Sequence, residues 1–380
     1  MDRIISDKIS KSLKSCLILG PRQVGKSTLL RSMKPSLTIN LAKESEYHRY
    51  TSEPGRIEQV VEAGEYKTIF IDEIQRIPSM LNSVQALIDE SEGRLKFFLS
   101  GSSARKLRRG HANLLPGRLF VFNMGGLCGA EIPKGVSTAK LLRFGVLPEI
   151  VLNSGDEFCS SLLDSYAGTY LREEIQAEAV VQNLQGFSRF LTEAGVAAGQ
   201  ILDYSKIARN AKISRTTCVR FFEILQDTLM VERCDSFNDV EGADVIQHPR
   251  FYFFDNGVRN ALVGSYELSS ERKGIVFEHF IYNQIRNSLL ARNLKANIQF
   301  FRTRSGLEVD FIVSIGKSMW AIEIKTGSIA EGDLKALRVF KSLAGRDVQC
   351  IAVGLQESMP RKSKDIFICD WRTLLLKMGL

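Results

Sequence analysis

Residue types that bind phosphate follow one another near the start of the chain, in the stretch SCLILGPRQVGKSTLLRSM. Gly20 is followed after four residues by Gly25, Lys26 and Ser27, with an apolar strand pattern before them and a helical pattern after them. Glycines let backbone N–H groups surround phosphate oxygens, the lysine reaches the β and γ phosphates, and the hydroxyl coordinates Mg²⁺. The spacing and both flanks predict a P-loop that binds ATP and Mg²⁺.

A second apolar strand pattern, TIFIDE, ends in the adjacent acids Asp72 and Glu73. After a P-loop, such a strand places one carboxylate near Mg²⁺ and the next near the attacking water. We therefore expect Asp72 to help hold the metal and Glu73 to position the water. The alternative is a pair of acids that caps a helix.

A third strand pattern, KFFLSGSS, brings Ser100, Ser102 and Ser103 to the expected γ-phosphate end of the site. The basic stretch ARKLRRGHANLLPGRLF follows it and contains no acid. An arginine supplied by a neighbouring subunit could stabilise the charge that develops during phosphoryl transfer. We assign this role to Arg118. Residues 105–109 fit a solvated or phosphate-binding basic loop equally well.

The complete set of residues predicted to contact ATP or its metal comes from these three motifs. It consists of Gly20, Pro21, Arg22, Gln23, Val24, Gly25, Lys26, Ser27, Thr28, Asp72 and Ser100.

A second group of charged residues lies in apolar strand patterns of the last third of the chain. In WAIEIKTG, Glu323 and Lys325 share one face of a strand, because strand side chains alternate. In LEVDFIVSIG, Glu308 and Asp310 also share one face. Burying charges costs several kcal/mol unless they are paired or bound to a metal, so the pattern indicates a site or a local ion pair.

Metal-assisted phosphodiester chemistry would account for these residue types. Asp310 and Glu323 supply the oxygen ligands that Mg²⁺ prefers, and Lys325 can orient or help deprotonate a water. Glu278, on a preceding helical pattern, could bind a second metal or a water, whereas Glu308 is as easily a solvated edge residue. The alternatives are a Glu323–Lys325 ion pair without chemistry and a fold kept only for binding.

The middle of the chain has helical periodicity from about residue 137 to 200. Residues 201–234 then show helix-turn-helix spacing, with Arg215, Thr216, Thr217 and Arg220 at the start of the second helix, where a DNA reader contacts its target. Packing beside an ATPase core is the alternative role. The stretch RFYFFDNGVRNAL is expected to form a strand closed by an Asp-Asn-Gly turn.

Composition sets the broad class. The 380 residues are 44% hydrophobic and 25% charged, typical of a folded protein, and the net charge of +8 permits contact with nucleic acid without establishing it. Seven scattered cysteines form no CxxC pair, which favours reduced core residues over disulfides or zinc. Without an apolar leader or a membrane-length apolar run, we expect a cytoplasmic location and no membrane partner.

The motifs GPRQVGKST, IFIDEIQ and SGSS, followed by a PGR-like turn, resemble those of prokaryotic AAA-type ATPases. The resemblance implies a five-stranded parallel sheet, nucleotide-dependent homo-oligomers, Ser100 or Ser102 as a polar sensor, and Arg118 as the arginine acting in trans. The acids and lysine of the last third resemble the PD-(D/E)XK nuclease constellation. Glu278 matches the extra acid of its resolvase-like members.

These observations predict an α/β protein of three domains. They are an AAA-type P-loop domain at 1–136, a helical and winged-helix domain at 137–263, and a restriction-endonuclease-like domain at 264–380. We expect an ATPase whose nucleotide state controls a DNA-binding or DNA-cleaving domain. The alternative is an ATP-dependent switch that binds or remodels a partner protein and carries an inactive nuclease-like domain.

Overall fold

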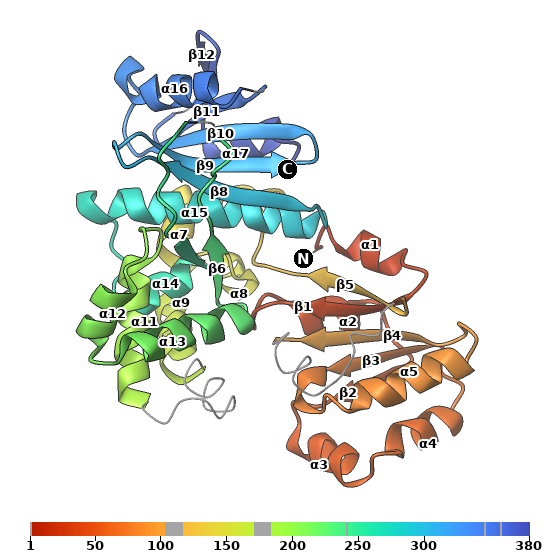
Figure 1. The fold of residues 1–380 in the computed structure, drawn as a ribbon. Helices are drawn as coiled ribbons and strands as arrows, with labels where there is room; N and C mark the ends of the chain where they lie inside the picture. Colours follow the sequence, from red (N-terminus) through yellow and green to blue (C-terminus); the bar gives the residue numbers. More distant parts are fainter. Residues whose placement is uncertain (1, 103–116, 171–183, 241, 346, 358) are drawn as a thin grey trace. The chain divides into compact units, whose positions relative to one another are not determined.

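The computed structural model describes residues 2–102, 117–170, 184–240, 242–345, 347–357 and 359–380 (Figure 1). The chain divides into two compact units, Met1–Gly125 with Asp227–Met230, and Gly126–Gln226 with Val231–Leu380. Within the described ranges, no helix is both long enough and apolar enough to cross a lipid bilayer.

The first unit contains a five-stranded parallel sheet with the strand order β2-β3-β4-β1-β5 (Figure 1). The central strand β1 is buried at every position, as expected for a parallel strand covered on both faces. This sheet confirms the five parallel strands expected for an AAA-type domain. The strands are β1 (Ser15–Leu19), β2 (Leu37–Asn40), β3 (Thr68–Asp72), β4 (Lys96–Gly101) and β5 (Leu119–Asn123).

Short helices connect these strands. Leu81 and Val84 of α5 are fully buried and pack into the same apolar core as Ile57 of α4 and Ile69 and Ile71 of β3. The connecting elements are α1 (Ser6–Ser10), α2 (Lys26–Ser32), α3 (Glu44–Ser52), α4 (Arg56–Glu62), η1 (Ile74–Arg76) and α5 (Met80–Glu90).

The second unit contains a six-stranded mixed sheet with the order β12-β13-β11-β10-β9-β8. Strand β10 is antiparallel to β9 and parallel to β11, so the strand pairing changes from antiparallel to parallel at the centre of the sheet. The strands are β8 (Ala296–Arg302), β9 (Glu308–Ile315), β10 (Ser318–Lys325), β11 (Gln349–Gly354), β12 (Arg361–Ser363) and β13 (Ile366–Cys369).

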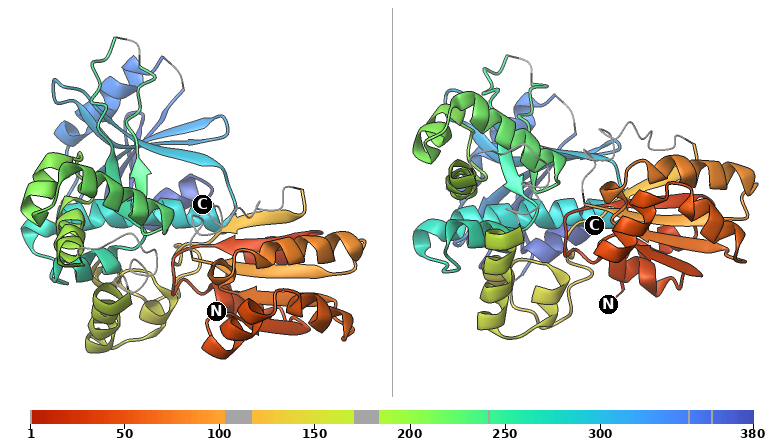
Figure 2. Two further views of the ribbon diagram at one scale, coloured as in Figure 1. Left: turned by 60° about the horizontal axis from the view of Figure 1, so that its bottom comes forward. Right: turned by 90° about the horizontal axis from the view of Figure 1, so that it is seen from below.

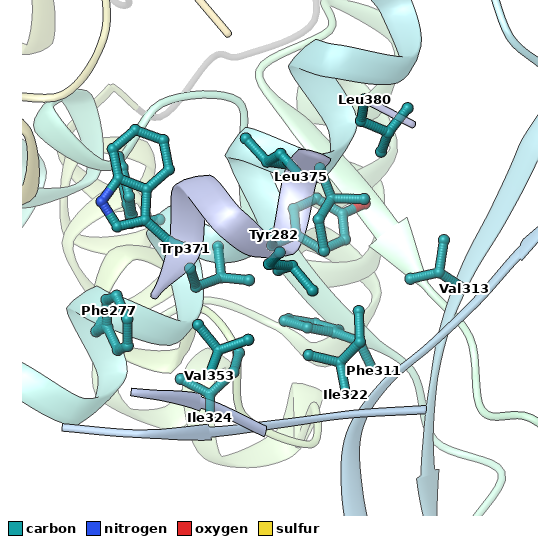
Figure 3. Packing of buried hydrophobic residues seen from close by; sticks show 14 of the residues in the cluster. Phe277, Tyr282, Phe311, Val313, Ile322, Ile324, Val353, Trp371, Leu375 and Leu380 are labelled. Atoms are coloured by element: carbon teal, nitrogen blue, oxygen red, sulfur yellow. The ribbon is translucent and has the colours of Figure 1, made fainter. Parts of the chain in front are cut away.

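Helices cover both faces of this sheet. The long helix α15 (Ser270–Ala291) and α17 (Trp371–Lys377) pack on one face, where side chains from the helices and the strands point toward one another (Figure 3). On the other face, α16 (Lys335–Leu343) packs Leu337 and Phe340 against Ala321 of β10. A four-residue 3-10 helix, η3 (Glu331–Leu334), precedes α16. The sheet thus forms the middle layer of three.

The helical segment that precedes this sheet in the chain belongs to the same unit. Helices α11, α12 and α13 lie toward one end of α15 (Figure 2), and an antiparallel pair, β6 and β7, follows them. The elements are α7 (Thr138–Phe144), α8 (Pro148–Leu152), α9 (Asp156–Ser165), η2 (Tyr166–Tyr170), α11 (Leu184–Ala197), α12 (Tyr204–Ala211), α13 (Arg215–Asp227), β6 (Val231–Cys234), β7 (Arg250–Phe253) and α14 (Asn256–Val263).

The chain after β6 continues along the edge of the six-stranded sheet. Phe237 N donates to Phe300 O at 2.7 Å, and Phe300 N donates to Asp235 O at 3.1 Å. An uncovered edge strand exposes unpaired backbone N–H and C=O groups. This segment forms hydrogen bonds with such groups on the outer edge of β8. Middle and last segments therefore share one hydrogen-bonded framework and one apolar core.

One local expectation was wrong: residues 255–257 do not form a turn that closes a strand. Asp255 is the N-cap of α14, accepting from Val258 N at 3.0 Å and from Val146 N at 2.7 Å. Full burial raises the pKa of Asp255 to about 6, although these N–H donors lower it. A side chain at Gly257 would overlap Phe144 O, so Asp-Asn-Gly here begins a tightly packed helix.

Candidate functional site

The predicted P-loop lies between the end of β1 and the start of α2. Gly25 has φ of 95°, which glycine adopts at little cost. A Cβ on Gly20 would lie 2.1 Å from Met124 O, so a glycine is required where the loop passes the end of β5. Arg3, which the sequence did not single out, donates from Nη1 to Val24 O at 2.7 Å and steadies the loop.

Lys26 points back into this loop. Its Nζ donates to Gly20 O and to Pro21 O, both at 2.7 Å, and the residue is 5% exposed. Within the predicted set, Val24 is buried whereas Gln23 and Thr28 are exposed and Arg22 is half-buried. The ammonium group is therefore held inside the ring of backbone atoms that would surround a phosphate.

Three side chains converge on the buried carboxylate of Asp72 at the end of β3. Ser27 donates to Oδ1 at 2.7 Å, and Ser100 donates to the same oxygen at 2.5 Å. Arg31 Nη2 donates to Oδ2 at 3.0 Å. The structure thus brings together the serine, the acid and the polar strand end that the sequence predicted, and adds Arg31, which the sequence did not indicate.

Glu73 lies next to this group in a left-handed backbone conformation with φ of 60°. Its N–H donates to Ser100 Oγ at 3.1 Å, so one serine contacts both acids. Gln75 Nε2 donates to the Glu73 carboxylate and also to Ser102 Oγ at 2.9 Å. The sequence did not identify Gln75, although the residue falls within the quoted motif IFIDEIQ.

Arg118 is not part of this group. It precedes β5, whose first residue Leu119 pairs with Ser15 at the beginning of β1, whereas the P-loop follows the end of β1. Arg118 Nε donates to Asp89 Oδ1 at 2.6 Å. The arginine therefore lies at the end of the strands opposite to the loop of its own unit, and its action on the ATP site of a neighbouring subunit stays a prediction.

Ser103 and the basic positions Arg105, Lys106, Arg108 and Arg109 lie outside the described residues.

A second cluster forms in the other unit, where β9 and β10 carry the predicted acids. The register pairs Phe311 with Ile322, so Asp310 and Glu323 occupy the next positions on neighbouring strands. Asp310 Oδ2 accepts from Ile324 N at 2.7 Å, and Lys325 Nζ donates to Glu323 Oε1 at 2.6 Å.

Glu278 of α15 joins the cluster through two residues of β7. Tyr252 Oη donates to Glu278 Oε1 at 2.6 Å, and Arg250 Nη1 donates to the same oxygen at 3.3 Å. Arg250 Nη2 also donates to Glu308. The guanidinium is 3% exposed and lies 4.3 Å from the centre of the Phe300 ring. Neither Arg250 nor Tyr252 was predicted, because their partners are 26 to 58 residues away in the sequence.

The acids of this cluster shift one another's pKa values. Burial, followed by the negative charge of Asp310, raises the pKa values of Glu278 and Glu323 well above the usual range. Burial also raises the pKa of Asp310, although the Ile324 N–H and Lys325 oppose this shift. Burial lowers the pKa of Lys325, but the Glu323 carboxylate outweighs this effect and the net shift is upward.

The two sites differ in how well they fit a divalent cation. In the first unit, Ser27 and Asp72 supply a hydroxyl and a carboxylate in contact, the oxygen donors that Mg²⁺ takes in P-loop proteins. Across the described ranges, no three His, Cys, Asp or Glu side chains are already arranged to hold a metal. In the second cluster, Glu323 Oε2 is buried and has no hydrogen-bond partner among the residues that the structure describes, which fits an oxygen open to a cation.

A parallel sheet with this strand order, the loop after β1 and the Ser27–Asp72 pair define the first unit as a P-loop ATPase domain of the AAA type. Residues 12–132 match the family model described as "AAA domain". Residues 137–269 and 273–373 match two models described as domains of unknown function, DUF8612 and DUF4143. This domain binds nucleotide.

Similar proteins include an uncharacterized protein of Mycobacterium tuberculosis and one of Mycobacterium bovis. Each is 26% identical over 319 residues, covering 82% of this chain and 70% of the relative. The replication initiator DnaA bound to AMPPCP and single-stranded DNA is 11% identical, with a TM-score of 0.29, over 58% of this chain and 86% of that one. Protein VC1899 from Vibrio cholerae is 12% identical, with a TM-score of 0.20, over 96% and 93%.

Proposed function

We propose that the protein hydrolyses ATP in its first unit and uses the nucleotide state to control metal-dependent cleavage of DNA by the acid cluster of the second unit. The observation that carries the second half is the convergence of Asp310, Glu323 and Lys325 on adjacent strands, with a buried carboxylate oxygen that has no partner in the described part of the chain. The three-domain division stays part of this proposal.

In the ATPase site, each predicted residue has a distinct task. Lys26 and the loop from Gly20 to Thr28 would hold the phosphates, and Ser27 and Asp72 would hold Mg²⁺, which would supply positive charge to offset that of the phosphates. Ser100 donates to the carboxylate of Asp72 and accepts from the backbone N–H of Glu73, so it links the side chain of one acid to the backbone of the other. Glu73 orients and deprotonates the attacking water.

We expect Glu73→Gln to leave ATP binding intact and to reduce kcat by about 100-fold or more, because the amide cannot accept the proton. Two measurements check this: the steady-state rate of ATP hydrolysis, and the equilibrium binding of a fluorescent ATP analogue. Glu65→Gln, which changes an exposed acid of the same unit, is the control. Equal turnover by Glu73→Gln and the parent protein would show that the water-positioning acid is misassigned.

In the second unit, Asp310 and Glu323 would hold Mg²⁺ or Mn²⁺, and Glu278 would hold a second cation or orient a water. The metal would polarise the phosphodiester. Lys325, already in contact with Glu323, would orient the water and offset phosphate charge. Asp310 and Glu323 are directly next to the paired residues Phe311 and Ile322 on neighbouring strands, so the backbone fixes their spacing.

DNA could reach this unit through α12 and α13. Arg215 and Arg220 are exposed on α13, while Phe221 and Phe222 face the core. Two helices followed by the β6–β7 pair support a winged-helix assignment for this segment. We propose that the exposed start of α13 contacts DNA, and that homo-oligomers bring Arg118 to a neighbouring ATP site.

A second candidate function is an ATP-dependent switch that binds a partner protein through an inactive nuclease-like domain. The observation in its favour is that the carboxylates of the cluster already have partners within the protein, and that no three-ligand metal set is preformed in the described ranges. A parent protein that hydrolyses ATP but cuts no DNA in Mg²⁺ or Mn²⁺ would favour this candidate.

A further inference from the structure

The carboxylate of Asp72 accepts hydrogen bonds from three side chains. The side chain is only 5% exposed, and it accepts from Ser27 and Ser100 at Oδ1 and from Arg31 at Oδ2. A buried carboxylate needs a compensating charge or several hydrogen bonds to remain ionised. In the described part of the first unit, Arg31 is the cation paired with it.

The contacts divide two tasks between the two carboxylate oxygens. The hydroxyls of Ser27 and Ser100 both act on Oδ1 and come from separate elements, α2 and the end of β4, so they fix the orientation of the carboxylate. Arg31 contacts Oδ2 alone. What Arg31 adds is therefore mainly its positive charge.

The geometry of Arg31 suits a reversible contact. It follows Ser27 by four residues on α2, so both side chains extend from the same helix face toward Asp72. Only one guanidinium nitrogen reaches the carboxylate, and the arginine side chain is 52% exposed. Because half of the side chain already faces water, the guanidinium can exchange its contact with Asp72 for hydration without having to leave a buried position.

We propose that Arg31 is a resident counter-cation of Asp72, which competes with the Mg²⁺ that accompanies the nucleotide and so sets how much Mg²⁺ the site requires. This inference rests on the proposed nucleotide site and adds a residue that regulates its metal occupancy. Arg31 already neutralises the carboxylate of Asp72. A divalent cation bound to the same carboxylate would lie close to the guanidinium, and the two positive charges would repel each other.

The test measures binding of the fluorescent analogue mant-ATP to the full chain while Mg²⁺ is titrated from a chelated start. We expect Arg31→Gln to lower the half-saturating Mg²⁺ concentration about fivefold, the size of a partly exposed charge interaction. Arg31→Lys should behave like the parent. Arg49→Gln is the matched control, because Arg49 is similarly exposed and pairs with Glu46 instead.

An unchanged Mg²⁺ requirement in Arg31→Gln would overturn the proposal, and so would a higher one, which would mean that Arg31 positions Asp72 for the metal. Thermal unfolding of each variant checks that the first unit remains folded. Lys26→Ala tests the nucleotide site itself, independently of Arg31. If it bound mant-ATP as well as the parent, the nucleotide site would be misassigned and the inference would fall with it.

Discussion

Lys26→Ala is expected to weaken ATP binding by at least about 100-fold. Its ammonium group contacts two carbonyls of the loop and is the charge available inside the ring of backbone atoms. Removing it eliminates charge-assisted hydrogen bonds to phosphate and leaves Gly20 O and Pro21 O without these donors. Isothermal titration with ATP and Mg²⁺ measures the loss.

The matched control is Lys43→Ala, which removes an exposed lysine of the same unit. It should bind ATP like the parent. If Lys26→Ala retained the affinity of the control, residues 20–28 would not be the nucleotide site, whatever their resemblance to a P-loop.

Arg250→Met should lower the free energy of unfolding of the second unit by about 3–5 kcal/mol, because it leaves the carboxylates of Glu278 and Glu308 close to Asp310 without their buried cation. The methionine keeps most of the side-chain volume, so the loss reports charge more than packing. Urea unfolding followed by circular dichroism gives the value.

Two further variants separate this explanation from general damage. Arg304→Met removes an arginine whose ion pair with Asp244 is exposed, and it should change stability little. Adding Glu278→Gln and Glu308→Gln to Arg250→Met should recover most of the loss, because the buried cation and the two carboxylates that it offsets are then all absent, and Arg302, the other partner of Glu308, is 41% exposed and stays solvated. A triple variant as unstable as Arg250→Met would show that the arginine acts through packing.

The nucleotide site could be predicted largely from the sequence because its residues lie in three short motifs at strand ends. In a parallel sheet, the ends of neighbouring strands converge, so Ser27, Asp72 and Ser100 meet as expected. Arg31 and Gln75 lie inside or beside these motifs, yet their contacts depend on side-chain directions that residue type alone does not specify.

The second site could be predicted from the sequence only in part. Strand alternation predicted only that Glu323 shares a face with Lys325 and that Asp310 shares a face with Glu308. Arg250 and Tyr252 reach Glu278 from β7, which no strand pattern indicated. Such a contact depends on tertiary packing across the unit. Tertiary contacts also explain why Asp255 begins a helix where a turn was expected. Its side chain accepts from Val146 N, which belongs to a distant segment of the chain.

The central claim is that one chain couples ATP hydrolysis to DNA cleavage, and a paired assay of one preparation tests it most directly. Hydrolysis and cutting of single-stranded, duplex and branched DNA would be followed in Mg²⁺ or Mn²⁺, with and without ATP, for the parent, Glu73→Gln and Asp310→Asn. We expect the parent to cut DNA at a rate that depends on nucleotide. Asp310→Asn should hydrolyse ATP but cut about 100-fold more slowly or not at all. A parent that cuts nothing, or an Asp310→Asn variant that cuts as fast as the parent, would contradict the account.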